Sequence, residues 1–253
     1  MRCPRDDLRP WKGHSSKSLS HYIFPFLRDP VLANVVPPQA ENLMYFLRHG
    51  LGSHVDYLFV LNSDLRESIV IQTRSNIHIL RRENSRVIFC YDLGSFKVGV
   101  EYLEQALGKT YKRLIMINAS VRGPFMPTYT PGCWIDNFLS RLQKDVKLVG
   151  TTFNCADRRH VQSQVISVDR TGYELIAPAL ACHVHLWDAV ANGEIAATRL
   201  VRDAGFKVDV MMMSFHAGEK AVEECNTRDI NFPNGYHGRS IHPYEVMFIK
   251  ANR

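Results

Sequence analysis

The stretch that decides the fold is "LIMINASVRGPF", residues 114–125. Four apolar residues in a row end abruptly in Asn118-Ala119-Ser120, and Gly123-Pro124 follows. Buried strands of α/β enzymes often end in this way, and ligands of such sheets lie beyond the carboxyl ends of the strands. The stretch therefore predicts a buried strand whose polar tip faces a ligand, and it poses the question of why that tip carries no acid.

Apolar runs and helical spacing alternate along the rest of the chain. Buried strands are expected where apolar runs end in polar or turn residues, and helices where apolar residues recur every three to four positions. The expected strands are 21–26, 55–62, 76–80, 113–120, 146–153, 164–169 and 206–213, and the expected helices are 39–51, 95–107, 134–143, 170–180 and 194–205. This alternation predicts an α/β fold with helices on both faces of a sheet that is mostly parallel in its first half.

Composition places limits on the partners. The 253 residues are 45% hydrophobic, which suits one α/β domain over residues 1–253. A net charge of +6 fits an anionic ligand such as a nucleotide. It also fits a mildly basic protein with no such ligand, and the basic residues are too scattered to predict nucleic-acid binding. No apolar stretch approaches the ~20 residues of a membrane span. The N-terminus lacks an apolar signal core, so any anchor or signal is expected outside this chain.

The cysteine pattern favours neither a zinc site nor a disulfide scaffold. No two of the six cysteines form a C-x-x-C pair, and their wide spacing does not suggest disulfides. We expect most of them to be buried thiols; they are Cys3, Cys90, Cys133, Cys155, Cys182 and Cys225. The segment "CHVH", 182–185, offers two histidines on one strand face but no further ligand pair, so it predicts no metal site.

The order of these segments resembles a glycosyltransferase of the GT-A fold, a three-layer α/β/α sandwich with a mostly parallel sheet. "YLFVLNSD" looks like the strand whose polar tip lies by the nucleotide base, and "RREN" followed by "CYDLGSFKVGVEYLEQAL" resembles the segment opening the next helix. "YKRLIMINASV" falls where the family carries its D-x-D metal motif. "WIDNFLSRLQKDVKLVG" resembles the helix and strand that follow this motif, and "GEIAATRLVRDAGFKVDV" the segment where inverting members place a catalytic acid.

Within the GT-A fold, the chain is most similar to the rhamnan-synthesis-type group, through "NASVRGPF", "HVQS" and "HPYEVMFIKANR". The resemblance covers roughly residues 20–253. It implies a nucleotide-sugar-binding half at about 20–120 and an acceptor-binding, catalytic half at about 121–253. It also implies a donor of UDP or dTDP type, a glycan acceptor and work in polysaccharide biosynthesis in the Golgi or another endomembrane lumen; the cytoplasm is the alternative compartment.

Two departures from the family affect the donor site. Asn118-Ala119-Ser120 replaces D-x-D, and "SRVIF", 85–89, looks like an insertion beside Asn84. A neutral strand tip offers no charge to recruit Mg²⁺ or Mn²⁺. We therefore expect no required cofactor, although either ion remains possible, and we expect no metal-ligating residue. Fixed cations would then stabilise the departing diphosphate.

The resemblance and the strand ends together give a set of donor-binding candidates. Asp92 could bond a ribose hydroxyl or simply cap a helix, Asp64 could lie at the base or in a surface turn, and Asn118 and Ser120 could bond the donor or only stabilise a tight turn by side-chain hydrogen bonds. The predicted cations are Arg122, Lys250 and Arg253, with His242 as a further hydrogen-bond donor. The complete set is Asp64, Arg82, Asn84, Asp92, Gly94, Asn118, Ser120, Arg122, His242 and Lys250.

Glu194 is the predicted catalytic base, with Asp188 as the alternative. Glu194 precedes a helical pattern, so it is expected at a helix N-terminus, where the helix dipole favours the ionised carboxylate. An ordinary first-turn acid would show the same pattern. His160 and Gln162 of "HVQS" alternate onto one face and are the predicted acceptor-binding pair. Trp134 and Trp187 are expected in core or rim packing rather than on a sugar.

The predicted function is transfer of a sugar from a nucleotide diphosphate to a glycan hydroxyl, with inversion of configuration. The main alternative is an inactive, GT-A-like nucleotide- or carbohydrate-binding protein, which the absent D-x-D favours. Dehydrogenases and methyltransferases are disfavoured, because no glycine follows the first predicted strand at 21–26.

Overall fold

The computed structural model describes residues 20–26, 38–61, 71–73, 75–81, 91–154, 156, 158–217 and 229–251. Within them a seven-stranded sheet has the order β10-β6-β9-β4-β1-β2-β3. Its strands are β1 (Ser20–Phe26), β2 (Asp56–Leu61), β3 (Ile77–Arg81), β4 (Arg113–Ile117), β6 (Val146–Gly150), β9 (Val165–Asp169) and β10 (Lys207–Val210). Of these, only β9 runs antiparallel to its neighbours, β4 and β6. The predicted α/β class with a mostly parallel sheet is confirmed.

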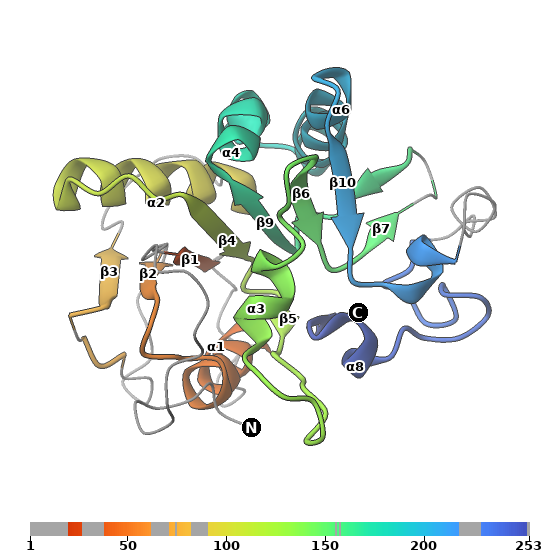
Figure 1. Cartoon of the computed structure of the whole chain (residues 1–253), viewed down its shortest axis with the longest axis horizontal. Coiled ribbons are helices and arrows are strands. Elements are labelled where there is room, and N and C mark those ends of the chain that lie inside the picture. The colour runs from red at the N-terminus through yellow and green to blue at the C-terminus, as the bar shows by residue number, and fades with distance from the viewer. Residues whose placement is uncertain are drawn as a thin grey trace.

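Helices cover both faces of this sheet, which makes the fold a three-layer α/β/α sandwich (Figure 1). Helices α2, α4 and α6 lie on one face, and α1 and α3 lie on the other. Their bounds are α1 (Pro38–His49), α2 (Asp92–Leu107), α3 (Trp134–Leu139), α4 (Arg170–Ile176) and α6 (Ala196–Asp203). Shorter pieces are α5 (Leu186–Asp188), α8 (Pro243–Val246), the π-helix η2 (Ala189–Ile195), and the 3-10 turns η1 (Ala177–Ala179) and η3 (Met213–His216).

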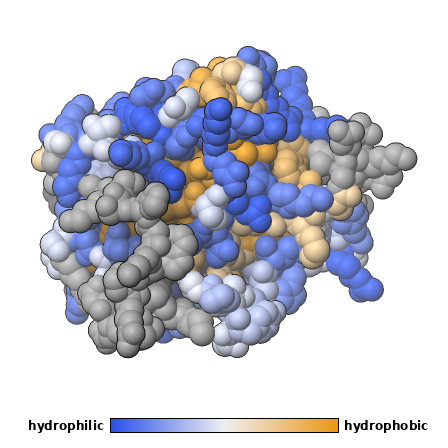
Figure 2. Space-filling view, in the orientation of Figure 1, coloured by the Kyte–Doolittle hydropathy of each residue, from blue (hydrophilic) through white to orange (hydrophobic). Residues whose placement is uncertain are grey.

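The apolar runs seen in the sequence form the core between these layers. All six residues of β2 are buried, as are residues 114–117 of β4. Helix α2 buries Leu93, Phe96, Val100 and Leu103, whose spacing of three and four places them on one face of the helix. Burying each such side chain stabilises the fold by about 1.5–3 kcal/mol. Figure 2 shows that hydrophobic residues reach the surface in the middle of this face of the molecule, among hydrophilic ones.

Two small sheets bring distant segments beside the end of β4. Strand β5 (Val121–Arg122) follows β4 closely and pairs antiparallel with β11 (Ile249–Lys250), so that Lys250 faces Val121 in the register. Strand β7 (Phe153–Asn154) pairs with β8 (His160–Val161). The β5–β11 pair thus places the end of the described chain next to Asn118-Ala119-Ser120.

Several predicted elements are shorter in the structure; the strand expected over 206–213, for example, is β10 at Lys207–Val210. The helix expected over 134–143 ends at Leu139, because the chain continues in tight turns: Arg141 N–H donates to the Phe138 carbonyl at 3.3 Å. The strand expected over 146–153 divides into β6 and β7 after Gly150. A Cβ atom at Gly150 would lie 2.3 Å from Val161 Cγ1, so the glycine allows β8 to cross this point.

The expectation of free thiols is wrong for the two cysteines within the described residues. Cys133 and Cys182 are both disulfide-bonded. Wide spacing in the sequence was a poor guide, because the fold and not the spacing decides which cysteines meet. Within the described ranges, no helix has the length and apolar character needed to cross a membrane.

Replacing Gly172 by alanine is expected to destabilise the fold. The new Cβ atom would lie 2.0 Å from the carbonyl oxygen of Lys147, so α4 would have to move away from β6. Overpacking of this kind costs about 1–3 kcal/mol. Chemical denaturation measures the loss, with Thr171→Ala at the neighbouring exposed position as the control. Equal stability of the two variants would contradict the close approach of α4 and β6.

Candidate functional site

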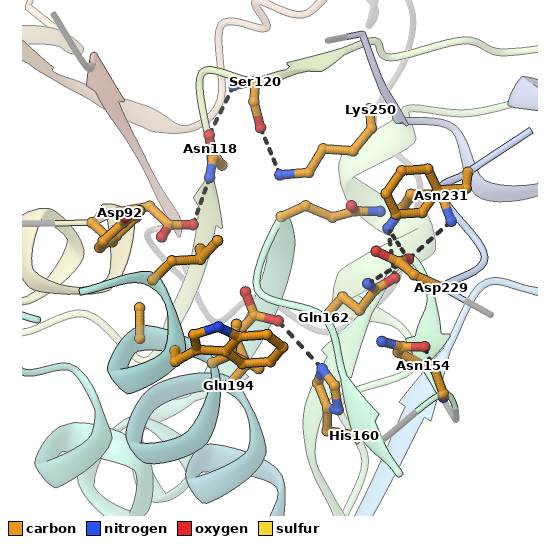
Figure 3. A pocket seen from close by; sticks show the side chains of 18 of the residues that line it. Asp92, Asn118, Ser120, Asn154, His160, Gln162, Glu194, Asp229, Asn231 and Lys250 are labelled. Carbon is orange, nitrogen blue, oxygen red and sulfur yellow. Dashed lines mark hydrogen bonds and ion pairs between the residues drawn. The ribbon is translucent and has the colours of Figure 1, made fainter. Parts of the chain in front are cut away.

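A cavity of about 420 Å³ opens where β4 ends (Figure 3). It lies beyond the carboxyl end of a central strand, where α/β sheets bind their ligands. Polar side chains from several separate segments converge on it, and apolar residues form part of its wall. The lining residues are Tyr91, Asp92, Asn118, Ala119, Ser120, Asn154, Ala156, His160, Gln162, Gln164, Leu186, Trp187, Ala189, Val190, Glu194, Asp229, Asn231, Phe232 and Lys250.

Asn118, at the tip of β4, connects the strand to helix α2. Its Nδ2 donates to Asp92 Oδ2 at 2.6 Å, and its Oδ1 accepts from the backbone N–H of Ser120 at 2.8 Å. The second bond fixes the orientation of the amide, because only an oxygen can accept there. The neutral strand tip thus holds an acid in place instead of supplying one itself.

Asp92 is the first residue of α2 and is buried. Burial, followed by the nearby charge of Glu194, raises the pKa of the Asp92 carboxyl above its usual value. Lys250 and the hydrogen bonds from Asn118 and Ser163 oppose this rise. Asp92 is therefore a buried acid that resists ionisation, and no side-chain cap from Tyr91 precedes it on the helix.

Glu194 lies inside a continuous helical segment and not at a helix N-terminus as predicted. The segment begins at Leu186, passes through the π-helix η2 and continues as α6. The helix dipole at an N-terminus therefore does not act on Glu194. Two side chains hold its carboxylate instead: Ser163 Oγ donates to Oε1 at 2.8 Å, and His160 Nε2 lies 3.3 Å from Oε2. π-Helical turns of this kind often occur at functional sites.

His160 on β8 is held at both ring nitrogens. Its Nδ1 lies 2.5 Å from the carbonyl oxygen of Arg158, and its Nε2 faces Glu194. Burial alone would lower the pKa of His160, but the hydrogen bonds to Glu194 and Arg158 and the charges of Glu194 and Asp229 raise it overall. Because both nitrogens face acceptors, the ring fits the doubly protonated form, which stabilises an ionised Glu194.

A second polar cluster forms the opposite wall of the cavity. Gln162 Nε2 donates to Asp229 Oδ1 at 3.1 Å, and Gln162 Oε1 accepts from Asn231 Nδ2 at 2.8 Å. Thr152 Oγ1 also donates to Gln162 Oε1, at 2.8 Å. Each amide is therefore fixed by its neighbours, and the wall presents oriented donors and acceptors to a polar ligand.

Lys250 supplies a cation at the end of the cavity nearest the β4 tip. Its Nζ donates to Ser120 Oγ at 2.9 Å, and β11 holds its backbone beside β5. Trp187 and Phe232 line the cavity with exposed fractions of 72% and 48%. The cavity thus combines the Lys250 ammonium, three acids, an amide wall and two exposed aromatic rings.

The structure brings together seven of the residues that the sequence predicted. Asp92, Asn118, Ser120, Lys250, His160 and Gln162 line the cavity together with Glu194. Asp188 is exposed and is not among the lining residues. Trp134 is buried in the core, where its Nε1 donates to the Gly50 carbonyl at 2.9 Å.

Other nominated residues lie away from the cavity or outside the described residues. Arg122 pairs with Glu41 Oε2 at 2.8 Å and with Asn42 Oδ1 at 2.9 Å, both on α1. His242 accepts from Tyr244 N–H at the start of α8, and Gly94 is buried in the first turn of α2. The residues outside the described ranges are Asp64, Arg82, Asn84 and Arg253.

Several residues of the site were not identified from the sequence: Ser163, which contacts Asp92 and Glu194, and a number of lining residues. Ser163 and Gln164 directly follow the nominated Gln162, and Gln164 continues the alternation of His160 and Gln162. Asn154 is not part of any such alternation in the sequence. Asp229 and Asn231 reach the site from a distant segment with no periodic pattern of its own.

No group of three His, Cys, Asp or Glu side chains suited to a metal ion occurs within the described ranges. Asp92 and Glu194 of the cavity wall both contact Ser163 Oγ. Cys182 of the "CHVH" segment is disulfide-bonded and so has no thiolate to offer a metal.

The pairing of His160 with Glu194 predicts a pH-dependent contribution to stability. A histidine whose folded pKa is raised stabilises the fold fully below its unfolded pKa, about 6.5. This contribution is lost as the pH rises through the raised folded value. The stability of the wild type relative to His160→Gln should therefore fall with rising pH above about 6.5. Denaturation at several pH values measures it, with exposed His185→Gln as the control; a pH-independent difference would contradict the ion pair.

No protein-family model matches the sequence, and the search of curated proteins finds no match. Solved structures give weak similarities. A mutant of Drosophila β-1,4-galactosyltransferase 7, in complex with manganese, UDP-Gal and xylobiose, is 11% identical with a TM-score of 0.40; the match covers 76% of this chain and 64% of that one.

Two further similar structures are 4-diphosphocytidyl-2C-methyl-D-erythritol synthases. That of Anaerococcus prevotii is 12% identical with a TM-score of 0.45, covering 82% of this chain and 96% of its own. The other is 14% identical with a TM-score of 0.39, covering 77% and 89%. TM-scores below 0.5 do not assign this chain to a family or an activity.

Proposed function

We propose that this protein is a glycosyltransferase that moves a sugar from a nucleoside diphosphate to a hydroxyl of a glycan. The observation that carries the proposal is the Glu194 carboxylate. It lies at the cavity wall, is fixed by His160 and Ser163, and has Lys250 and Ser120 at the other end of the same cavity. A positioned base and a positioned cation are the two groups that direct displacement of a diphosphate needs.

The reaction balances with these groups. The acceptor hydroxyl gives its proton to Glu194 as its oxygen forms a bond to C1 of the donor sugar. The bond from C1 to the diphosphate oxygen breaks, and its electron pair leaves with the diphosphate. Lys250 and the Ser120 hydroxyl would stabilise that growing negative charge. A single displacement inverts the configuration at C1.

The neutral strand tip supports a transfer that needs no bound metal. Asn118 and Ser120 carry no carboxylate that could hold a metal ion on the diphosphate. Instead, Asn118 donates to Asp92, and Ser120 accepts a hydrogen bond from Lys250. Lys250 is the fixed charge that would replace such an ion. UDP and dTDP sugars remain the proposed donors, and the likeness to the rhamnan-synthesis-type group remains a proposal.

The wall opposite Glu194 suits a sugar acceptor. The amides of Gln162 and Asn231 and the carboxylate of Asp229 are oriented by one another. Exposed Phe232 beside this wall, and exposed Trp187 on the helical segment that carries Glu194, offer flat apolar faces to a sugar ring. Oriented amides with aromatic faces match a ring that carries hydroxyls at its edge and C–H groups on its face.

The disulfides support a location in the secretory route. Disulfide bonds such as those of Cys133 and Cys182 persist in oxidising compartments and are rare in the cytosol. We propose that the protein works in the Golgi or another endomembrane lumen. Loss of folding when the cysteines are kept reduced during expression would support this location, and full folding under reducing conditions would oppose it.

Measured release of nucleoside diphosphate tests the proposed function. The purified protein is incubated with UDP-, dTDP- and GDP-sugars and a set of oligosaccharide acceptors, each with Mn²⁺ or with a chelator. Acceptor-dependent release that persists with the chelator, and a product of inverted anomeric configuration, is the expected result. Nucleotide binding without transfer to any acceptor would favour the alternative, an inactive nucleotide- or carbohydrate-binding protein.

Trp187→Ala is expected to weaken acceptor binding selectively. Loss of a stacking face costs about 1–1.5 kcal/mol, roughly a tenfold rise in the acceptor KM. The donor KM should change little, because Lys250 and Ser120 lie at the other end of the site. Steady-state kinetics with each substrate varied in turn measures both constants. Tyr129→Ala removes another exposed aromatic ring, 84% exposed and outside the cavity, and serves as the control; equal effects of the two changes would contradict the stacking role.

A further inference from the structure

Ser163 lies between Asp92 and Glu194, two of the three acids that line the cavity. Its Oγ is 3.2 Å from Asp92 Oδ2 and 2.8 Å from Glu194 Oε1, both within hydrogen-bond distance (the two acids are labelled in Figure 3). Ser163 itself is buried, at 3% exposure. A serine hydroxyl carries one proton, so it can donate to only one of these oxygens at a time.

The contact that lacks the serine proton requires a proton from elsewhere. With both acids ionised, a lone pair of Ser163 Oγ would face a carboxylate oxygen at hydrogen-bond distance in a buried place, which is unfavourable. Asn118 cannot supply the proton that is missing between Ser163 and the acids. Its Nδ2 already donates to Asp92, and its Oδ1 accepts from the Ser120 N–H. One proton on the acid pair turns both contacts into hydrogen bonds.

Burial and neighbouring charges decide which acid carries this proton. The Glu194 carboxylate is 22% exposed and faces His160, whereas Asp92 is more deeply buried. Burial and the charge of Glu194 raise the pKa of Asp92, while Lys250 on β11 opposes the rise. His160 in turn lies beside Glu194 and within reach of the Asp229 charge. These groups together favour a neutral Asp92 and an ionised Glu194.

We infer that Ser163 is a positioning residue that holds one proton on Asp92 while Glu194 stays ionised. The hydrogen bonds then run in one direction, from the Asp92 O–H to Ser163 Oγ and from the Ser163 O–H to Glu194. The functional consequence rests on the proposed glycosyl transfer: the acid at the donor end of the cavity, Asp92, is neutral. An ionised Asp92 would repel the diphosphate that Lys250 attracts.

Infrared spectroscopy detects this proton without any substrate. A protonated carboxyl absorbs as a C=O stretch that ionised carboxylates lack, and at neutral pH the ordinary acids of the chain are ionised. We expect the wild type to show one such band at neutral pH. Aspartate labelled with ¹³C should shift the band, and ¹³C-glutamate should leave it in place, so the assignment needs no substitution.

Variants connect the band to the three residues. Asp92→Asn should abolish it, whereas Asp136→Asn, at an exposed acid, should preserve it. Ser163→Ala removes the acceptor of the Asp92 O–H, so the band should move to higher frequency; Ser167→Ala, at another buried serine, should not move it. In Glu194→Gln the negative charge that helps to raise the pKa of Asp92 is gone. Asp92 should therefore lose its proton, and the band should disappear, at a lower pH than in the wild type.

Three results would overturn the inference: no band at neutral pH, a band shifted by ¹³C-glutamate, or a band unmoved in Ser163→Ala. None of these readouts requires catalysis. An Asp92 band in a protein that transfers no sugar would leave the shared proton established and reject the glycosyltransferase proposal alone. Transfer activity without the band would do the reverse.

Discussion

Glu194→Gln is expected to lower the rate of sugar transfer by about 10²- to 10⁴-fold, the usual contribution of a positioned general base. Glutamine keeps the shape of the side chain and can still accept from Ser163, but it cannot take the acceptor proton. The loss should appear in kcat. Nucleotide affinity should stay near the wild-type value, because Lys250 and Ser120 remain in place.

Single-turnover rates and calorimetric nucleotide titration separate these two effects. Glu101→Gln, on the exposed side of α2, is the matched control and should behave as the wild type. A Glu194→Gln protein that transfers sugar at more than a tenth of the wild-type rate would remove Glu194 from the role of base. Asp229 would then be the acid of the cavity wall to examine next, since Asp188 does not line the cavity and Asp92 is inferred to be protonated.

Lys250→Ala is expected to lower kcat by about 10²- to 10³-fold, as the loss of one stabilising donor at a developing charge does. The lysine lines the end of the cavity nearest the tip of β4, where its Nζ donates to Ser120 Oγ. Charge on the departing diphosphate grows as the C1–O bond breaks, so the ammonium contributes most in the transition state. Affinity for free nucleoside diphosphate should fall as well, because that product carries the same charge.

Lys250→Arg distinguishes charge from shape. The arginine keeps a positive charge and should recover part of both losses, whereas Lys112→Ala, at an exposed position before β4, should lose neither. Recovery of Lys250→Ala by added Mn²⁺ would show that a divalent cation can replace the lysine. Unchanged kcat in Lys250→Ala without any metal would reject the role of Lys250 in leaving-group stabilisation.

The strands and helices were predictable because burial imposes its period on the sequence. After their charged first residues, strands β2 and β4 are unbroken apolar runs, since both of their faces are covered by helices. The same reasoning located Asn118 and Ser120 at the strand tip, and the structure places both at the cavity. Local pattern is sufficient wherever a residue's surroundings come from its own strand or helix.

The remainder of the site depends on contacts between distant segments, which leave no local pattern. Asp229 meets Gln162 across 67 positions of sequence, and Glu194 is held by side chains of β8 and the segment after it. Glu194 was nominated for the wrong physical reason, because the sequence does not show that the helix begins at Leu186 and widens into a π-turn. The sequence suggested that Arg122 is a cation available to the donor, but in the structure it pairs with Glu41 on α1.

Thermal melting with nucleotides tests the central claim, that the cavity beyond β4 is a nucleotide-sugar donor site. Wild type and Lys250→Ala are melted with UDP, dTDP, GDP and CMP, each with Mn²⁺ or with a chelator. A ligand that binds the folded state raises the melting temperature by mass action. The account predicts a rise for the wild type with UDP or dTDP that persists with the chelator and shrinks in Lys250→Ala. An unchanged melting temperature with every nucleotide, with and without Mn²⁺, would contradict it.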